Sequence, residues 1–198
     1  MIRVYSQKRS GTHLVMSYIH FNFILNYKKD NKYSARIANT YFSDGEKTTK
    51  GRSIVPWGPL FGSHRFYKNQ PLEECIYIIR NPYYQLVSLA KFLGKTDSID
   101  GILENNKIEY WKKHVESYTS AGVFCVFYED LVLNPVLIVD KLQKQFNLDR
   151  KTDDIIKINN PVGWNPFQTE RIEYKDLKDD IKKRFQDVLG KEYLIYNF

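Results

Sequence analysis

Three short apolar runs, each followed by a polar turn and a stretch of helical spacing, constrain the fold of this chain more than any other feature. The runs are IRVYS (2–6), ECIYII (74–79) and VFCVFY (123–128). The second and third are almost entirely apolar, as is typical of strands that are buried on both faces of a parallel sheet. Strands that alternate with helices predict an α/β fold, in which helices cover both faces of a mostly parallel β-sheet.

The segments between and after these runs supply the helices. Apolar residues recur at helical spacing in 14–25, 83–93, 137–146 and 174–189, a more polar helical stretch spans 100–120, and residues 60–63 are a further candidate strand. A chain of 198 residues can bury one full core and has little room for a second. We therefore expect a single domain that spans residues 1–198.

The chain is basic, with 30 Lys and Arg against 23 Asp and Glu and a net charge of +7. This balance favours anionic partners, including nucleotides, acidic glycans and nucleic acid, without choosing among them. The basic residues are spread along the chain rather than gathered into a stripe with stacking aromatics. We therefore do not expect a nucleic-acid partner.

The sequence predicts neither a membrane span nor a metal site. Its apolar runs fall far short of the roughly 18 residues of a membrane span, and its start lacks the pattern of a signal peptide, so we expect a cytoplasmic protein. Cys75 and Cys125 lie in apolar runs, without a CxxC motif or a Cys/His cluster. This placement predicts buried free thiols and no metal.

The segment QKRSGTH (7–13) joins the first strand to the first helix and has the features of an anion-binding turn. Backbone N–H groups at a helix N-terminus point outward and, with the helix dipole, attract an anion. Gly11 lets the backbone approach a ligand closely, and its neighbours add hydroxyls and charge: Lys8, Arg9, Ser10 and Thr12. The GxxxxGK[ST] pattern of a nucleotide-triphosphate loop is missing, because Thr12 follows Gly11 and no glycine lies five residues earlier. A phosphate or sulfate suits this turn better than a magnesium triphosphate, although an ordinary basic turn has the same features.

Polar residues also follow the other two runs. Arg80 ends the second run, and Ser88 lies about two turns into the next helix, so both can reach an anion at the carboxyl end of the strand. Open α/β sheets bind their ligands at that edge. The third run ends in Tyr-Glu-Asp-Leu (128–131), with Asn134-Pro135 beyond it.

Together these three stretches resemble the PAPS-dependent sulfotransferase family, where PAPS is 3′-phosphoadenosine 5′-phosphosulfate. The family opens with a strand and a Pro-Lys/Arg-Ser-Gly-Thr-Thr turn, whose place is taken here by residues 8–13. A later strand ends in Arg-(Asp/Asn)-Pro with a Ser eight residues after the Arg, as at Arg80 and Ser88, and a third ends in Tyr-Glu-Asp-Leu. The resemblance covers residues 2–25, 60–93 and 123–148, and it implies a P-loop-like sulfotransferase fold.

The resemblance implies a donor site without a metal. Its first turn would hold the 5′ phosphate and the sulfuryl group of PAPS, and Arg9 would neutralise the charge on the bridging oxygen as the sulfuryl group leaves. Arg80 and Ser88 would bind the 3′ phosphate. Tyr128 would lie near the adenosine, although a core tyrosine at the end of a strand is an equal alternative. The implied cofactor-binding residues are Lys8, Arg9, Ser10, Gly11, Thr12, His13, Arg80, Ser88 and Tyr128.

The acceptor hydroxyl needs a base, and the resemblance points to His64. Many family members carry this base as a His just past the second strand, in a Lys-Thr-His context, and here Gly62 departs from the Lys. An imidazole suits general base work near neutral pH. Some members use a Glu, which leaves Glu46 as an alternative base. The alternatives for His64 are a loop residue and a residue that helps to bind phosphate. The basic C-terminal motif that closes over the 3′ phosphate in many members is missing at 159–164, and His20 and His114 are expected to be structural.

The resemblance implies an O-sulfotransferase that moves the sulfuryl group of PAPS to the hydroxyl of an acceptor and leaves PAP. Residues 28–60, which mix aromatic and basic side chains, are the expected acceptor-side loop segment. Such a mixture favours a carbohydrate or glycolipid, and a small alcohol or phenol is the alternative. Two other classes of function stay open: a P-loop-like small-molecule kinase, and a catalytically inactive nucleotide- or nucleic-acid-binding module. The sequence gives no oligomeric state.

Overall fold

The computed structural model describes residues 2–8, 10–25, 34–35, 55–56, 60–92, 106–157 and 179–190. The expected acceptor-side segment, 28–60, lies outside the described residues except at 34–35, 55–56 and 60, and so do Arg9 and Glu46. The extent of the domain, residues 1–198, therefore stays a prediction.

A four-stranded parallel sheet forms the centre of the fold, in the order β4-β1-β5-β6. The strands are β1 (Ile2–Ser6), β4 (Leu60–Ser63), β5 (Cys75–Ile79) and β6 (Phe124–Phe127). A separate antiparallel pair is formed by β2 (Ser34–Ala35) and β3 (Val55–Pro56). The predicted α/β fold with a mostly parallel sheet is confirmed.

Helices follow the strands as the sequence pattern predicts. They are α1 (Thr12–Asn22), α2 (Pro82–Phe92), α4 (Asn106–Thr119), α5 (Tyr128–Leu133), α6 (Pro135–Phe146), α7 (Asp179–Leu189) and the short 3-10 helix η1 (Leu72–Glu74). None of the helices within the described ranges has both the length and the hydrophobicity that crossing a bilayer requires.

Several element boundaries differ from the prediction by one to three residues, and the one that bears on the site is at Tyr128, which begins a helix instead of ending a strand. Glu129 and Asp130 lie in the first turn of α5, where carboxylates are favourable beside the positive end of the helix dipole. Pro135 then begins α6, a position that suits proline because its missing N–H has no partner there anyway. The strand predicted over 123–128 is therefore one residue shorter at each end, and the short helix α5 was not foreseen. The prediction that this strand is buried on both faces was also wrong, because β6 lies at the end of the strand order and only Val126 of its four side chains is buried.

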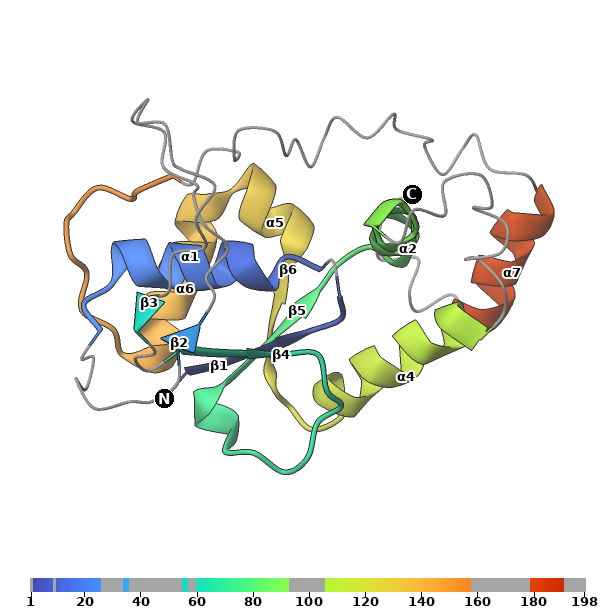
Figure 1. Ribbon diagram of the computed structural model, residues 1–198, viewed down its shortest axis with the longest axis horizontal. Coiled ribbons are helices and arrows are strands. Elements are labelled where there is room, and N and C mark those ends of the chain that lie inside the picture. The colour runs from blue at the N-terminus through green and yellow to red at the C-terminus, as the bar shows by residue number, and fades with distance from the viewer. Residues whose placement is uncertain are drawn as a thin grey trace.

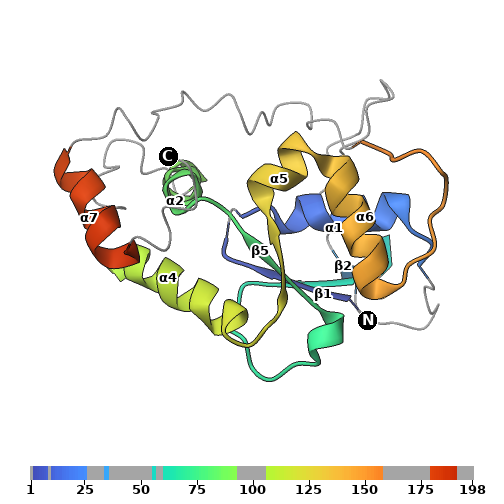
Figure 2. The same ribbon diagram turned by 180° about the vertical axis from the view of Figure 1, so that it is seen from behind.

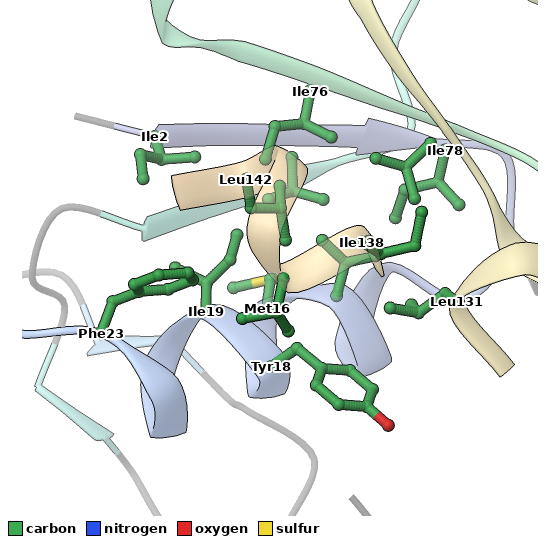
Figure 3. Close-up of a cluster of buried hydrophobic side chains, with 14 of the residues drawn as sticks. Ile2, Met16, Tyr18, Ile19, Phe23, Ile76, Ile78, Leu131, Ile138 and Leu142 are labelled. Carbon is green, nitrogen blue, oxygen red and sulfur yellow. The ribbon is translucent and has the colours of Figure 1, made fainter. Parts of the chain in front are cut away.

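Two helical layers cover the two faces of the sheet (Figures 1 and 2). Ile76 and Ile78 of β5 point into a core formed with α1, α5 and α6, where Met16 and Leu142 lie (Figure 3). The alternate residues of β5, Tyr77 among them, point to the opposite face and pack against α2, α4 and α7. All five side chains of β5 are buried, as the apolar run predicts for a strand covered on both sides.

The two cysteines are free thiols. Cys75 is buried, as expected, whereas Cys125 is half-buried. Burial raises the pKa of Cys125 to about 11, so this thiol is protonated at neutral pH.

Candidate functional site

The register of the parallel strands aligns the candidate residues along one edge of the sheet. The pairs at that edge are Tyr5 with Ser63, Ser6 with Ile78, and Ile79 with Phe127. The residues that follow the four strands therefore lie next to one another in the order His64, Gln7, Arg80 and Tyr128. This carboxyl edge is where open parallel sheets bind ligands.

The turn between β1 and α1 depends on Gly11, which lies in the left-handed region with φ 93° and ψ 18°. The ring of Tyr128 packs directly against this glycine. A Cβ atom at position 11 would lie 2.8 Å from Cε2 of Tyr128. A glycine at position 11 thus permits both the left-handed backbone conformation and the contact between the turn and Tyr128 at the start of α5.

Arg80 connects the middle of this edge to Tyr128. The guanidinium carbon lies 4.5 Å from the centroid of the Tyr128 ring, which is a cation–π contact. Only 7% of Arg80 is exposed, and this burial lowers the pKa of its guanidinium, although the nearby charge of Glu129 opposes the shift. A guanidinium presents a planar fork of N–H donors that matches the oxygens of a phosphate. Arg80 is therefore suited to binding an anionic group such as phosphate.

Glu129 fixes the start of α2 beside Arg80. Its Oε1 accepts a hydrogen bond of 3.0 Å from the backbone N–H of Asn81, whose own Oδ1 accepts from the N–H of Tyr83 at 3.0 Å. The second carboxylate oxygen of Glu129, Oε2, is buried and has no hydrogen-bond partner among the described residues. Burial raises the pKa of this carboxyl group. An acceptor atom in this position is suited to a ligand that brings a donor group.

Two glutamines hold the turn from either side. Gln85 of α2 donates from Nε2 to the carbonyl of Lys8 at 2.5 Å, and Gln7 donates to the carbonyl of Trp111 in α4 at 3.0 Å. Oε1 of Gln85 is also buried, and it has no hydrogen-bond partner in the part of the chain that the structure describes. Neither glutamine was assigned a role from the sequence, and nor was Glu129. A glutamine between the apolar positions of PYYQLVSLAKF was the pattern that could have indicated Gln85.

His64 lies at the end of β4, beside the end of β1. Its Nδ1 is 2.9 Å from the backbone oxygen of Ser6 and 3.4 Å from the Ser6 hydroxyl. A carbonyl oxygen can only accept, so Nδ1 carries the proton and Nε2 keeps its lone pair. The side chain is exposed, which leaves Nε2 accessible to a substrate. This tautomer is the one a general base at Nε2 requires.

No family model matches the sequence, and no curated protein matches it either. The structure matches the crystal structure of mouse sulfotransferase SULT7A1 complexed with PAP, with a TM-score of 0.63 and 17% sequence identity. The match covers 98% of this chain and 83% of that chain. The chain has a sulfotransferase fold. At this identity the likeness shows the fold alone.

The sulfotransferase fold brings several of the predicted site residues together. Tyr128 contacts both Gly11 and Arg80, and His64 lies against the end of β1. Other residues are placed less directly. Thr12 is buried, and its hydroxyl forms a hydrogen bond with that of Ser6. Ser10 is also buried, and its backbone N–H donates to the carbonyl of Gln7. Ser88 is buried in α2, whereas Lys8 is exposed.

Two of the predicted residues cannot be compared with the structure. Arg9 and the side chain of His13 lie outside what the structure describes. Across the described segments, no group of three His, Cys, Asp or Glu side chains is arranged to hold a metal ion. The functional roles of all the candidate residues stay predictions: Lys8, Arg9, Ser10, Gly11, Thr12, His13, His64, Arg80, Ser88 and Tyr128.

The contact between Gly11 and Tyr128 leads to a prediction about stability. Gly11→Ala should destabilise the fold by about 1–2 kcal/mol for the left-handed backbone, and by a further 1–3 kcal/mol or so for the overlap with the ring. Gly122→Ala is the matched control, because Gly122 has φ 77° and no atom within 4 Å of the added Cβ. Urea unfolding of both variants measures the difference. Equal losses of stability would show that the ring contact contributes nothing.

Proposed function

We propose that this chain is a PAPS-dependent sulfotransferase that transfers a sulfuryl group to the hydroxyl of an acceptor. The observation that carries the proposal is the alignment of an accessible imidazole, a glycine turn and a buried guanidinium along the carboxyl edge of the sheet. The sulfotransferase fold supports it, as does the PAP bound by the mouse sulfotransferase with which the chain shares that fold.

The residues of the edge fit a nucleotide with two separate anionic groups. The glycine turn at the start of α1 suits the 5′ phosphosulfate, and Arg80 suits the 3′ phosphate through the planar fork of its guanidinium. The unpaired acceptor oxygens of Gln85 and Glu129 suit hydrogen-bond donors, which a nucleoside offers through its hydroxyl and amino groups and a bare sulfate does not. The proposed ligand is therefore PAPS, and PAP after transfer.

His64 is the proposed general base. PAPS supplies the sulfuryl group when bound. The hydroxyl proton of the acceptor passes to Nε2 of His64 as the acceptor oxygen takes the sulfuryl group, and PAP is left. The Ser6 carbonyl, already hydrogen-bonded to Nδ1–H, then stabilises the positive charge of the imidazolium. Arg9 is assigned the neutralisation of the leaving oxygen on the resemblance alone.

The preferred acceptor is a carbohydrate or glycolipid, with a small alcohol or phenol as the alternative. This preference rests on the aromatic and basic composition of residues 28–60. A P-loop-like kinase is less well supported, because the position after the turn glycine is Thr12, which is buried and bonded to Ser6, where a kinase needs an extended lysine.

Thermal unfolding with candidate ligands tests the proposal. At a hundredfold excess over its dissociation constant, PAP should stabilise the fold by about 2.7 kcal/mol, which corresponds to a rise in Tm of roughly 5–10 °C for a chain of this size. Mg-ATP, AMP and inorganic sulfate at the same concentration should each give a smaller rise. A larger effect of Mg-ATP than of PAP would favour the kinase, and no effect of PAP would contradict the proposed donor.

A further inference from the structure

His114 is a buried histidine of α4 for which the proposed chemistry has no use. The residue is fully buried, yet both ring nitrogens have partners. Nε2 lies 3.3 Å from the backbone oxygen of His64, and Nδ1 lies 2.8 Å from the hydroxyl of Tyr77. One side of the ring thus contacts the backbone of the residue that carries the proposed base.

These partners determine the tautomer of His114. The carbonyl of His64 can only accept, so the proton is on Nε2, and Nδ1 accepts a hydrogen bond from the Tyr77 hydroxyl. Burial lowers the pKa of His114 to about 4, so the ring is neutral near pH 7. His114 is consequently a constant hydrogen-bond donor to the His64 peptide and does not itself exchange protons with a substrate.

The same face of α4 holds the residues that follow His64. The Tyr118 hydroxyl donates to the backbone oxygen of Arg65, and Ser117 accepts a hydrogen bond of 3.5 Å from the N–H of Tyr67. The rings of Tyr77 and Tyr118 stack, with centroids 4.2 Å apart and planes 7° apart. Residues 64–67 belong to no helix or strand, so hydrogen bonds from α4 set the path of their backbone.

We propose that His114 is a positioning residue for His64. It holds the His64 peptide through the carbonyl oxygen, while the Ser6 carbonyl holds Nδ1 of the ring, and the two contacts together keep Nε2 at the substrate side of the edge. The catalytic meaning of this inference rests on the proposed function. A displacement of about 1 Å of a catalytic group can cost up to a hundredfold in rate.

The tautomers can be tested without any activity. Long-range ¹H–¹⁵N spectra of the ¹⁵N-labelled full chain resolve the four histidines, and His114→Gln and His64→Gln assign two of them. We expect His114 to carry its single proton on Nε2 and to stay neutral between about pH 5 and 8, the range in which an ordinary histidine titrates. Neutral His64 should carry its proton on Nδ1. A His114 that titrates in this range, or that is protonated on Nδ1 when neutral, would overturn the proposal.

The functional role is tested with a pair of variants. His114→Leu removes the donor, whereas His114→Gln retains an N–H at a similar distance from the backbone. His114→Leu should lower kcat by up to about a hundredfold without changing the affinity for PAP, and the Nδ1–H form of His64 should be lost. His114→Gln should retain most of the wild-type kcat and most of the Nδ1–H form of His64. His20→Leu, at a histidine of α1 away from this edge, should change neither.

The outcomes separate the two proposals. Equal effects of Leu and Gln on kcat and on the His64 tautomer, or no effect of Leu on either, would refute the positioning role. If His114→Leu does not fold, as circular dichroism would show, His114→Phe replaces it, because this variant also removes the donor and keeps an aromatic ring beside those of Phe66 and Tyr118. A wild type that shows the expected tautomers and no sulfuryl transfer to any acceptor would support the hydrogen bonds of His114 and refute the proposed function, and with it the role in catalysis.

Discussion

Replacement of Arg80 by alanine is expected to remove most of the affinity for PAP. The guanidinium is 7% exposed, stacks on Tyr128 and ends the strand next to the glycine turn. Loss of one partner of a buried charge pair costs about 2–5 kcal/mol, which corresponds to a dissociation constant raised roughly thirtyfold to several thousandfold. Titration calorimetry with PAP on the wild type and the variant measures this change.

Two control variants make the Arg80 experiment specific. Arg80→Lys keeps the charge and loses the planar fork, so its affinity for PAP should lie between those of the wild type and Arg80→Ala. Arg184→Ala removes an exposed guanidinium of α7 and should leave the affinity unchanged. An unchanged affinity in a folded Arg80→Ala variant would exclude Arg80 from the donor site.

Replacement of His64 by alanine should lower kcat by at least about a hundredfold while PAP still binds. General base catalysis contributes about a hundredfold to ten-thousandfold, and the variant should lose a factor of this size from kcat. The affinity for PAP should stay unchanged, because the contacts of His64 are to Ser6 at the other side of the turn from Arg80. Steady-state sulfuryl transfer and calorimetry on the same sample measure the two quantities.

Chemical rescue distinguishes a lost base from a disturbed loop. His64 is exposed, so added imidazole can enter the space left by the alanine variant and should restore part of the transfer rate. His20→Ala should behave as the wild type. Transfer at the full rate in His64→Ala would pass the role of base to another residue, with Glu46 the alternative that the sequence leaves open.

Local pattern determined the strands and the turn. The apolar run before Arg80 predicts β5, and its five buried side chains follow from that composition. The spacing of SGT after a short strand predicts that α1 begins at a polar turn, and Gly11 does have the left-handed conformation that only glycine adopts at little cost. The alternation of strand and helix likewise predicts the α/β fold, because each strand needs cover on both faces.

Contacts between distant segments were decided by the tertiary structure alone. The amide of Gln85 reaches Lys8, and the ring of His114 reaches His64, over separations of 77 and 50 residues. Neither contact follows from the amino-acid composition or from the spacing of apolar residues, because each contact depends on which helix lies beside the end of which strand. Both residues are polar side chains in the core, which the sequence analysis left as unassigned or structural.

The sequence by itself determined that this protein alternates strands with helices and carries a glycine turn, an arginine and a histidine at the ends of strands. Such features are encoded locally, in side-chain period, caps and turn residues. The order β4-β1-β5-β6 and the register that aligns His64, Arg80 and Tyr128 on one edge were decided only by the tertiary structure. Pairing of strands far apart in the chain depends on burying both faces of the sheet at once, and no short stretch of sequence contains that information.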